Sequence, residues 1–146
     1  MKTIISNKFS SIKELKEIAR TLLEEIKPGM VVGFSGKLGV GKTELIRQIC
    51  SVLEVSDEIS SPTYTLENLY QAKDFDVSHW DLYRLKGQNI EIEQQIIELK
   101  QEEKAIILVE WPDLIKHLLD IHVLLSFADL EDSDSNRREI LVKKRL

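Results

Sequence analysis

A glycine-rich segment between an apolar run and a helical pattern constrains the fold of this chain more than any other feature. Residues 36–43, GKLGVGKT, place Gly36 and Gly41 five positions apart, with Lys42 and Thr43 directly behind. This is the pattern G-x-x-x-x-G-K-T, in which glycines let backbone N–H groups curl around an anion. Lysine then reaches the outer phosphates and threonine can ligate Mg²⁺. The segment therefore predicts a phosphate-binding loop.

The segments on either side of the loop support this interpretation. Residues 30–34 are apolar, and their valines suit a buried strand. Apolar residues at positions 45, 46, 49, 50 and 53 make one face of a helix. A helix that begins near Gly41 directs the positive end of its dipole at the loop. The alternative, a tight strand-to-helix turn with an unrelated lysine, is less consistent with this order.

The rest of the chain alternates between helical and strand-like segments. Ser11 and Glu14 form a capping box, and apolar residues at helical spacing from Ile12 to Ile26 predict a helix that stops at Pro28-Gly29. Residues 57–65, rich in Ser, Thr and Pro, predict a loop. Strands are expected over residues 66–71, 76–81, 105–109, 121–127 and 139–143, and an amphipathic helix over residues 89–104.

This order of elements is typical of an α/β fold of the P-loop NTPase type, with a mostly parallel central sheet flanked by helices. At 146 residues, we expect a single P-loop ATPase domain over residues 1–146. The last two strands surround an acidic turn and are expected to form a hairpin. The C-terminal end is basic, and we interpret it as a charged edge strand in preference to a surface that contacts tRNA or a partner. Its basic residues are Arg137, Arg138, Lys143, Lys144 and Arg145.

Composition narrows the class of protein. A formal net charge of −5 argues against autonomous binding to nucleic acid or to an anionic membrane. Cys50 is the single cysteine, so no internal disulfide can form and a reducing compartment is expected. No leader pattern and no apolar run of membrane-spanning length is evident. We therefore expect a cytoplasmic protein without a membrane partner. The sequence leaves self-association open, and a monomer is the simplest expectation.

Two carboxylates follow predicted strands and are candidates to accompany the phosphate loop. Glu110 comes directly after the apolar run 105–109, where an acid that holds Mg²⁺ or its waters belongs. Asp81 ends another predicted strand and is the second candidate for this role. Glu110 could instead be an ordinary charged residue at a strand end, and Asp81 a capping aspartate. Trp111, next to Glu110, is either a packing residue or a sensor of the nucleotide. His79, two residues before Asp81, is interpreted as structural in preference to catalytic.

Two other classes of P-loop protein can be weighed from motifs. GTPases read guanine with N-K-x-D, whereas the Asn7-Lys8 pair here is followed by Phe9-Ser10. Guanine specificity is therefore unsupported. Small-molecule kinases usually carry a lid with arginines that clamp the transferred phosphoryl group. No lid cluster of arginines is evident in mid-chain, so a kinase is only weakly indicated.

Three further segments follow the loop in order: SPTYTL at 61–66, HWDLYRL at 79–85 and VEWPD at 109–113. Together with the loop they resemble the TsaE family, also called YjeE, of small bacterial P-loop ATPases. The resemblance implies ATP-dependent participation in threonylcarbamoyladenosine formation on tRNA. It also implies a TsaB–TsaD complex as partner, which transfers the threonylcarbamoyl group and is reset by ATP hydrolysis, so that tRNA is met indirectly.

The resemblance implies roles for individual residues. Asp81, Glu110 and Lys42 would serve ATP turnover, and Thr43 and Glu110 would hold Mg²⁺. Thr63 and Thr65 fall in a switch-like segment near the γ-phosphate. The expected contacts with ATP or ADP are Gly36, Gly39, Val40, Gly41, Lys42, Thr43, Glu44, Thr63 and Trp111. We expect an ATPase that is weak alone and depends on its partner complex. A nucleotide-dependent binding module and a small-molecule kinase are the alternatives.

Overall fold

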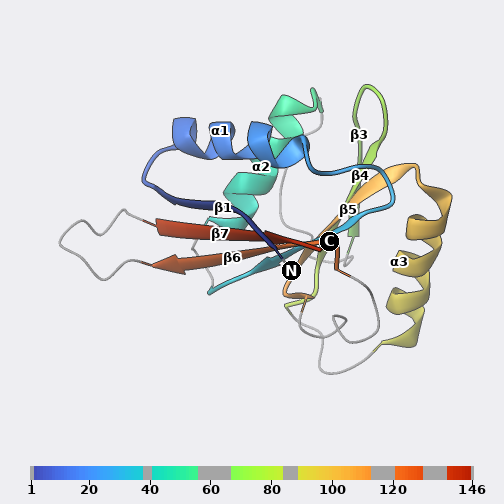
Figure 1. Ribbon diagram of the computed structural model, residues 1–146. Helices are drawn as coiled ribbons and strands as arrows, with labels where there is room; N and C mark the ends of the chain where they lie inside the picture. The colour runs from blue at the N-terminus through green and yellow to red at the C-terminus, as the bar shows by residue number, and fades with distance from the viewer. Residues whose placement is uncertain are drawn as a thin grey trace.

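The computed structural model describes residues 2–37, 41–55, 67–83, 89–112, 121–129 and 138–145. The described strands form one seven-stranded sheet with helices packed on it (Figure 1). No helix in these ranges is long and apolar enough to cross a membrane. The elements are β1 (Lys2–Phe9), α1 (Ile12–Leu23), β2 (Val31–Ser35), α2 (Lys42–Val52), β3 (Glu67–Gln71), β4 (Asp76–Asp81), α3 (Ile90–Glu102), β5 (Ala105–Glu110), β6 (Val123–Asp129) and β7 (Arg138–Lys144).

The centre of the sheet is parallel and its margins are antiparallel. The strand order is β1-β7-β6-β2-β5-β4-β3. The pairs β6–β2, β2–β5 and β5–β4 are parallel, whereas the pairs β1–β7, β7–β6 and β4–β3 are antiparallel. This architecture confirms the predicted mostly parallel central sheet. Because parallel strands end at the same edge, the carboxyl ends of β2, β5 and β4 meet there, with Glu110 in register with Phe34 and with Asp81.

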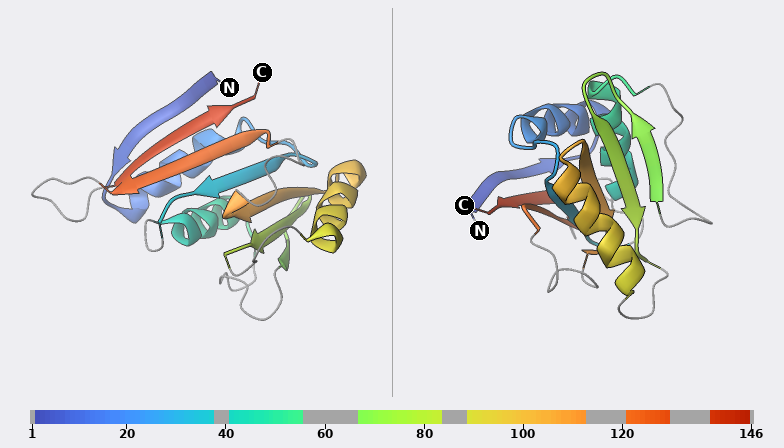
Figure 2. Two further views of the ribbon diagram at one scale, coloured as in Figure 1. Left: turned by 90° about the horizontal axis from the view of Figure 1, so that it is seen from below. Right: turned by 90° about the vertical axis from the view of Figure 1, so that its right-hand side faces the viewer.

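Helices cover both faces of the sheet. Val32 and Phe34 of β2 belong to the apolar cluster that contains the buried residues of α1 and α2. The preceding Val31 belongs to a second cluster with Ile92 and Ile96 of α3. Successive strand residues point to opposite faces. Therefore α1 and α2 cover one face and α3 covers the other, as Figure 2 shows.

The first helix begins as the capping box predicts. Ser11 is the N-cap, and its hydroxyl accepts from the Glu14 backbone N–H at 3.2 Å and donates to the Glu14 carboxylate at 3.0 Å. The helix ends at Leu23, before the predicted limit at Ile26. Ile26 remains buried all the same, in the irregular segment that precedes Pro28. The apolar pattern therefore identifies the buried face beyond the helix itself.

Two features of the sheet margin differ from expectation. The strand β1 is not predicted, because only Ile5 and Phe9 of its residues are buried and no apolar alternation marks it. The expectation that the C-terminal strand is an edge strand is wrong. The strand β7 lies between β1 and β6, and its Ile140 pairs with both Asn7 and Phe127. The N-terminal strand supplies the edge instead. The predicted antiparallel pairing of the last two strands is confirmed.

Gly33, in the middle of β2, should not tolerate a methyl group. A Cβ there would lie 3.1 Å from Pro112 Cγ and 3.3 Å from Leu124 Cδ1. Because a proline ring cannot swing aside, Gly33→Ala should lower the free energy of unfolding by about 1–3 kcal/mol. Urea unfolding measures this loss. Ser126→Ala, at an exposed position of the neighbouring β6, is the control, with an expected change under about 0.5 kcal/mol. Equal stabilities of the two variants would contradict the crowding.

Candidate functional site

The glycine-rich segment joins the end of β2 to the start of α2. Gly41 is the N-cap of α2 with φ of 106°, a left-handed conformation that favours glycine. Because glycine has no side chain, Gly41 leaves the first N–H groups of α2 without a side-chain cap, which suits an anion. Phe9 lies beneath this turn, with its ring 3.6 Å from the place of a Gly41 Cβ. Gly39 and Val40 lie outside the described residues.

Lys42 is buried at the start of α2, with 4% of its surface exposed. Its Nζ donates to the Gly36 carbonyl at 2.6 Å and lies 3.6 Å from the centroid of the Trp111 ring. Burial lowers the pKa of Lys42, while the charges of Glu110 and Asp81 act in the opposite direction. The ammonium thus faces the loop with a carbonyl and an aromatic face as its contacts.

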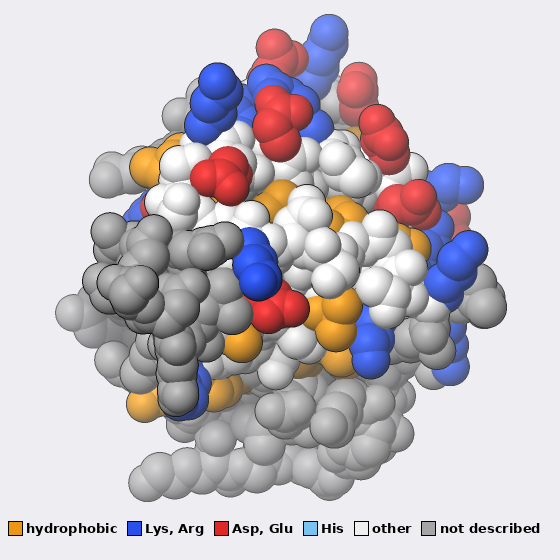
Figure 3. Space-filling view, turned by 60° about the vertical axis from the view of Figure 1, so that its left-hand side comes forward, with side chains coloured by type: hydrophobic (Ala, Val, Ile, Leu, Met, Phe, Trp, Pro, Cys, Tyr) orange, Lys and Arg blue, Asp and Glu red, His pale blue; other side chains and the backbone are white. Residues whose placement is uncertain are grey.

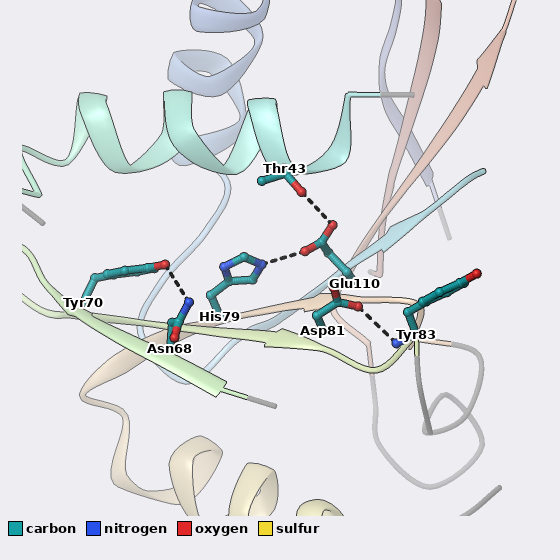
Figure 4. Close-up of polar contacts among 7 residues, drawn as sticks. All are labelled: Thr43, Asn68, Tyr70, His79, Asp81, Tyr83 and Glu110. Atoms are coloured by element: carbon teal, nitrogen blue, oxygen red, sulfur yellow. Dashed lines mark hydrogen bonds and ion pairs between the residues drawn. The ribbon is translucent and has the colours of Figure 1, made fainter. Parts of the chain in front are cut away.

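Glu110 connects α2 with β4. It is the last residue of β5 and is 3% exposed. Its Oε1 accepts from Thr43 Oγ1 at 3.2 Å, and its Oε2 lies 2.8 Å from His79 Nε2 (Figure 4). A buried carboxylate is costly without partners. Here each oxygen has its own partner, one from a helix and one from a strand.

The pair of Thr43 and Glu110 fits a magnesium ion bound together with phosphates. Mg²⁺ takes oxygen ligands at near-octahedral geometry, in which adjacent ligands lie about 2.9 Å apart. The 3.2 Å between Thr43 Oγ1 and Glu110 Oε1 is close to that spacing. No group of three or more His, Cys, Asp or Glu side chains in the described ranges could hold a metal ion. The ion would therefore need waters and phosphate oxygens to complete its ligands.

Asp81 ends β4 and is in register with Glu110. Its Oδ1 accepts from the Tyr83 backbone N–H at 3.1 Å (Figure 4). Burial raises the pKa of Asp81; the Tyr83 N–H opposes this shift and the charge of Glu110 adds to it. A carboxylate with a raised pKa at a strand end is a candidate to accept a hydrogen bond or a proton from water.

Trp111 turns the chain sharply after β5. Its φ of 59° is left-handed, and its N–H donates to the Phe34 carbonyl at 3.1 Å. The ring centroids of Trp111 and Tyr83 lie 5.0 Å apart, at an interplanar angle of 43°. The same Trp111 ring lies over Lys42. Trp111 thus packs at the sheet edge, as one of the two sequence interpretations predicts, and its ring also contacts Lys42. Its role in sensing nucleotide stays a prediction.

Glu44, which the resemblance predicts to contact the nucleotide, does not join this cluster. The Glu44 carboxylate instead accepts from Arg47 at 2.8 Å and from Gln48 at 3.1 Å, within its own helix. Thr63 and Thr65, with the whole switch-like segment, lie outside the described residues. The contact of His79 with Glu110 is not predicted by the sequence. The sequence gives one local indication: His79 lies two residues before Asp81 on β4, so the two side chains share one face of the sheet.

Comparison with known proteins identifies the family of this chain. A family model described as Threonylcarbamoyl adenosine biosynthesis protein TsaE matches residues 9–140. The TsaE protein of Rickettsia conorii, named a tRNA threonylcarbamoyladenosine biosynthesis protein, is 38% identical over 136 residues, covering 88% of this chain and 72% of that protein. The proteins of the same name from Rickettsia typhi and Haemophilus influenzae are 34% and 30% identical, covering 92% and 97% of this chain and 92% and 89% of their own lengths.

A solved structure shares the fold. The crystal structure of YdiB from Bacillus subtilis superposes with a TM-score of 0.76 and covers 99% of this chain and 88% of its own. The two sequences are 22% identical, so the likeness concerns the arrangement of the elements.

The raised pKa of Asp81 predicts how stability depends on pH. A raised pKa means that the folded state binds the proton more tightly, so stability falls as pH rises from the ordinary value of 3.8 through the folded value. Asp81→Asn should therefore be more stable than the wild type at pH 7, and the advantage should shrink toward pH 4. Urea unfolding across this range measures it. Asp74→Asn, in an exposed turn, should show no such pattern. A less stable Asp81→Asn at pH 7 would refute the assignment.

Proposed function

This chain belongs to the TsaE family of threonylcarbamoyladenosine biosynthesis proteins, and from that membership we propose that it binds and hydrolyses ATP in this pathway. One observation carries the proposal. The Thr43–Glu110 hydrogen bond lies beside the buried Lys42, where a phosphate-type loop meets the carboxyl ends of β2, β5 and β4. In open α/β sheets, ligands bind outside the carboxyl ends of the strands.

The first proposed step is capture of the phosphates by the loop. The uncapped N-terminus of α2 at Gly41 offers backbone N–H donors, and the helix dipole favours negative charge there. Lys42 Nζ would exchange the Gly36 carbonyl and the Trp111 face for phosphate oxygens, because hydrogen bonds between opposite charges are the stronger ones.

Thr43 and Glu110 are the proposed magnesium ligands or supports of its waters. When bound, the ion would neutralise charge on the phosphates and fix their orientation. Glu110 is already desolvated and aimed at Thr43, so little rearrangement of the protein is needed to form this part of the site.

Asp81 is the proposed orienting group for the attacking water. The Tyr83 N–H holds one carboxylate oxygen, which leaves the other to accept from a water. Hydrolysis of this kind requires positioning and electrostatic stabilisation, with no covalent intermediate. The raised pKa of Asp81 favours acceptance of a proton from that water.

The proposal includes a TsaB–TsaD complex as the partner that exploits ATP turnover, with tRNA contacted through that complex. The net charge of −5 supports an indirect role for tRNA, since direct binding needs a dense basic surface. On the face in Figure 3, the described acidic and basic side chains are intermingled. We further propose that the isolated chain is a single-domain monomer of low activity that acts in the cytoplasm.

The proposed activity is tested by ATP hydrolysis with and without a reconstituted TsaB–TsaD complex. Hydrolysis should be weak alone and rise with the complex, and Asp81→Asn should reduce the stimulated rate by about 100-fold while ATP still binds. Asp74→Asn is the matched control and should keep the wild-type rate. Tight ATP binding without stimulated hydrolysis would instead indicate a nucleotide-dependent binding module. Stimulation by a small metabolite would indicate a kinase.

Nucleotide binding should also be visible in tryptophan fluorescence. The chain has two tryptophans: Trp111 touches Lys42, whereas Trp80 is buried with its Nε1 donating to Ser78 at 2.7 Å. If phosphate draws Lys42 away from the Trp111 ring, MgATP should change the emission of the wild type and of Trp80→Phe. Trp111→Phe should lose the change. Retention of the change in Trp111→Phe would show that this ring does not follow the phosphate site.

A further inference from the structure

His79 is the one side chain of the cluster that is fully buried, with 0% of its surface exposed. Its Nε2 lies 2.8 Å from Glu110 Oε2, while its Nδ1 has no hydrogen-bond partner within the described part of the chain. The ring of Tyr70 from β3 lies beside it, with centroids 6.4 Å apart. An imidazole is thus held in the core by one polar contact, and that contact is with Glu110.

A histidine is a poor choice for packing alone at this position. A buried ring nitrogen without a partner destabilises the fold, whereas a phenylalanine or leucine would fill similar space without that cost. Val77, two residues earlier on the same face of β4, is buried and apolar. The presence of a polar ring at this position is therefore best explained by the contact of His79 Nε2 with Glu110.

The contact controls the orientation of the Glu110 carboxylate. The terminal torsion of a glutamate is broad, so an unrestrained carboxylate rotates easily. A carboxylate accepts hydrogen bonds, so His79 Nε2 carries the hydrogen and donates to Oε2. With Oε2 held in this way, Oε1 is turned toward Thr43 Oγ1 at 3.2 Å.

We propose that His79 is a positioning residue, whose Nε2–H orients Glu110 toward Thr43 and thereby sets the magnesium dependence of nucleotide binding. This inference rests on the proposed ATP-binding function. Partners of metal ligands commonly contribute 10- to 100-fold to metal affinity. The strand β4 then has two roles on one face, with His79 orienting Glu110 and Asp81 facing the water two residues later.

The test compares two substitutions in the full chain. Gln at position 79 can place an N–H donor near the position of Nε2, whereas Asn is too short to reach Glu110. The affinity for ATP is titrated with MgCl₂ present and again with EDTA. We expect His79→Asn to lose about 10-fold or more of the gain in affinity that Mg²⁺ confers on the wild type, with unchanged affinity in EDTA. His79→Gln should recover much of that gain.

The outcomes separate this inference from the function on which it rests. Equal magnesium gains in His79→Asn, His79→Gln and the wild type would overturn the positioning role. An equal loss of affinity with and without Mg²⁺ would also overturn it, because a merely structural residue acts on both. Thermal unfolding of each variant verifies the fold, and His79→Phe adds a variant of similar ring size without the donor. A wild-type chain that binds no ATP would refute the proposed function itself.

Discussion

The buried carboxylate of Glu110 is the constraint on which the site depends. All six residues of β5 are buried, so the strand delivers its terminal carboxylate to a place where water cannot solvate it. Such a charge is tolerated because Thr43 and His79 satisfy its two oxygens. These partners come from α2 and from β4, so the helix start and the neighbouring strand must both be correctly placed. The order β2-β5-β4, with all three strands parallel, meets that requirement, because the ends of the three strands then share one edge.

Local patterns in the sequence predict those elements of the site that are determined by residues close together in the chain. The glycines and the flanking apolar residues predict β2, the loop and α2, since a turn and a helix start are determined within a few positions. The apolar run ending at Glu110 predicts β5 for the same reason, because a strand buried on both faces is continuously apolar. The capping box of Ser11 and Glu14 likewise gives the start of α1. Each of these signals is contained in one short window of the chain.

Features that depend on distant pairing are beyond such patterns. The contact of His79 with Glu110 spans 31 positions and requires the parallel register that pairs Asp81 with Glu110. The interior position of β7 requires β1, whose own sequence carries little apolar alternation because one side of it is open. An edge strand needs few buried residues, so the apolar pattern of β1 is weak. When β1 is missed, its neighbour β7 is mistaken for the edge strand. The left-handed turn at Trp111 also depends on distant pairing, because the Trp111 N–H donates to Phe34 on the neighbouring strand β2.

The contacts of Lys42 suggest how occupancy of the loop could reach the surface. Because the Lys42 ammonium is charged and buried, its hydrogen bond to the Gly36 carbonyl contributes about 1.5–3 kcal/mol and its contact with the Trp111 ring about 2 kcal/mol. Phosphate oxygens carry formal negative charge, so a hydrogen bond from the ammonium to them gains the attraction between opposite charges, which a neutral carbonyl and a ring lack. Phosphate oxygens would therefore displace the Gly36 carbonyl and the Trp111 ring from the ammonium. Trp111 would then lose its contact with Lys42 while keeping Tyr83 as a neighbour. Because Tyr83 is 51% exposed, this aromatic pair joins the proposed phosphate site to the surface of the protein. On the proposed function, the presence of nucleotide would thus change side-chain packing at the sheet edge.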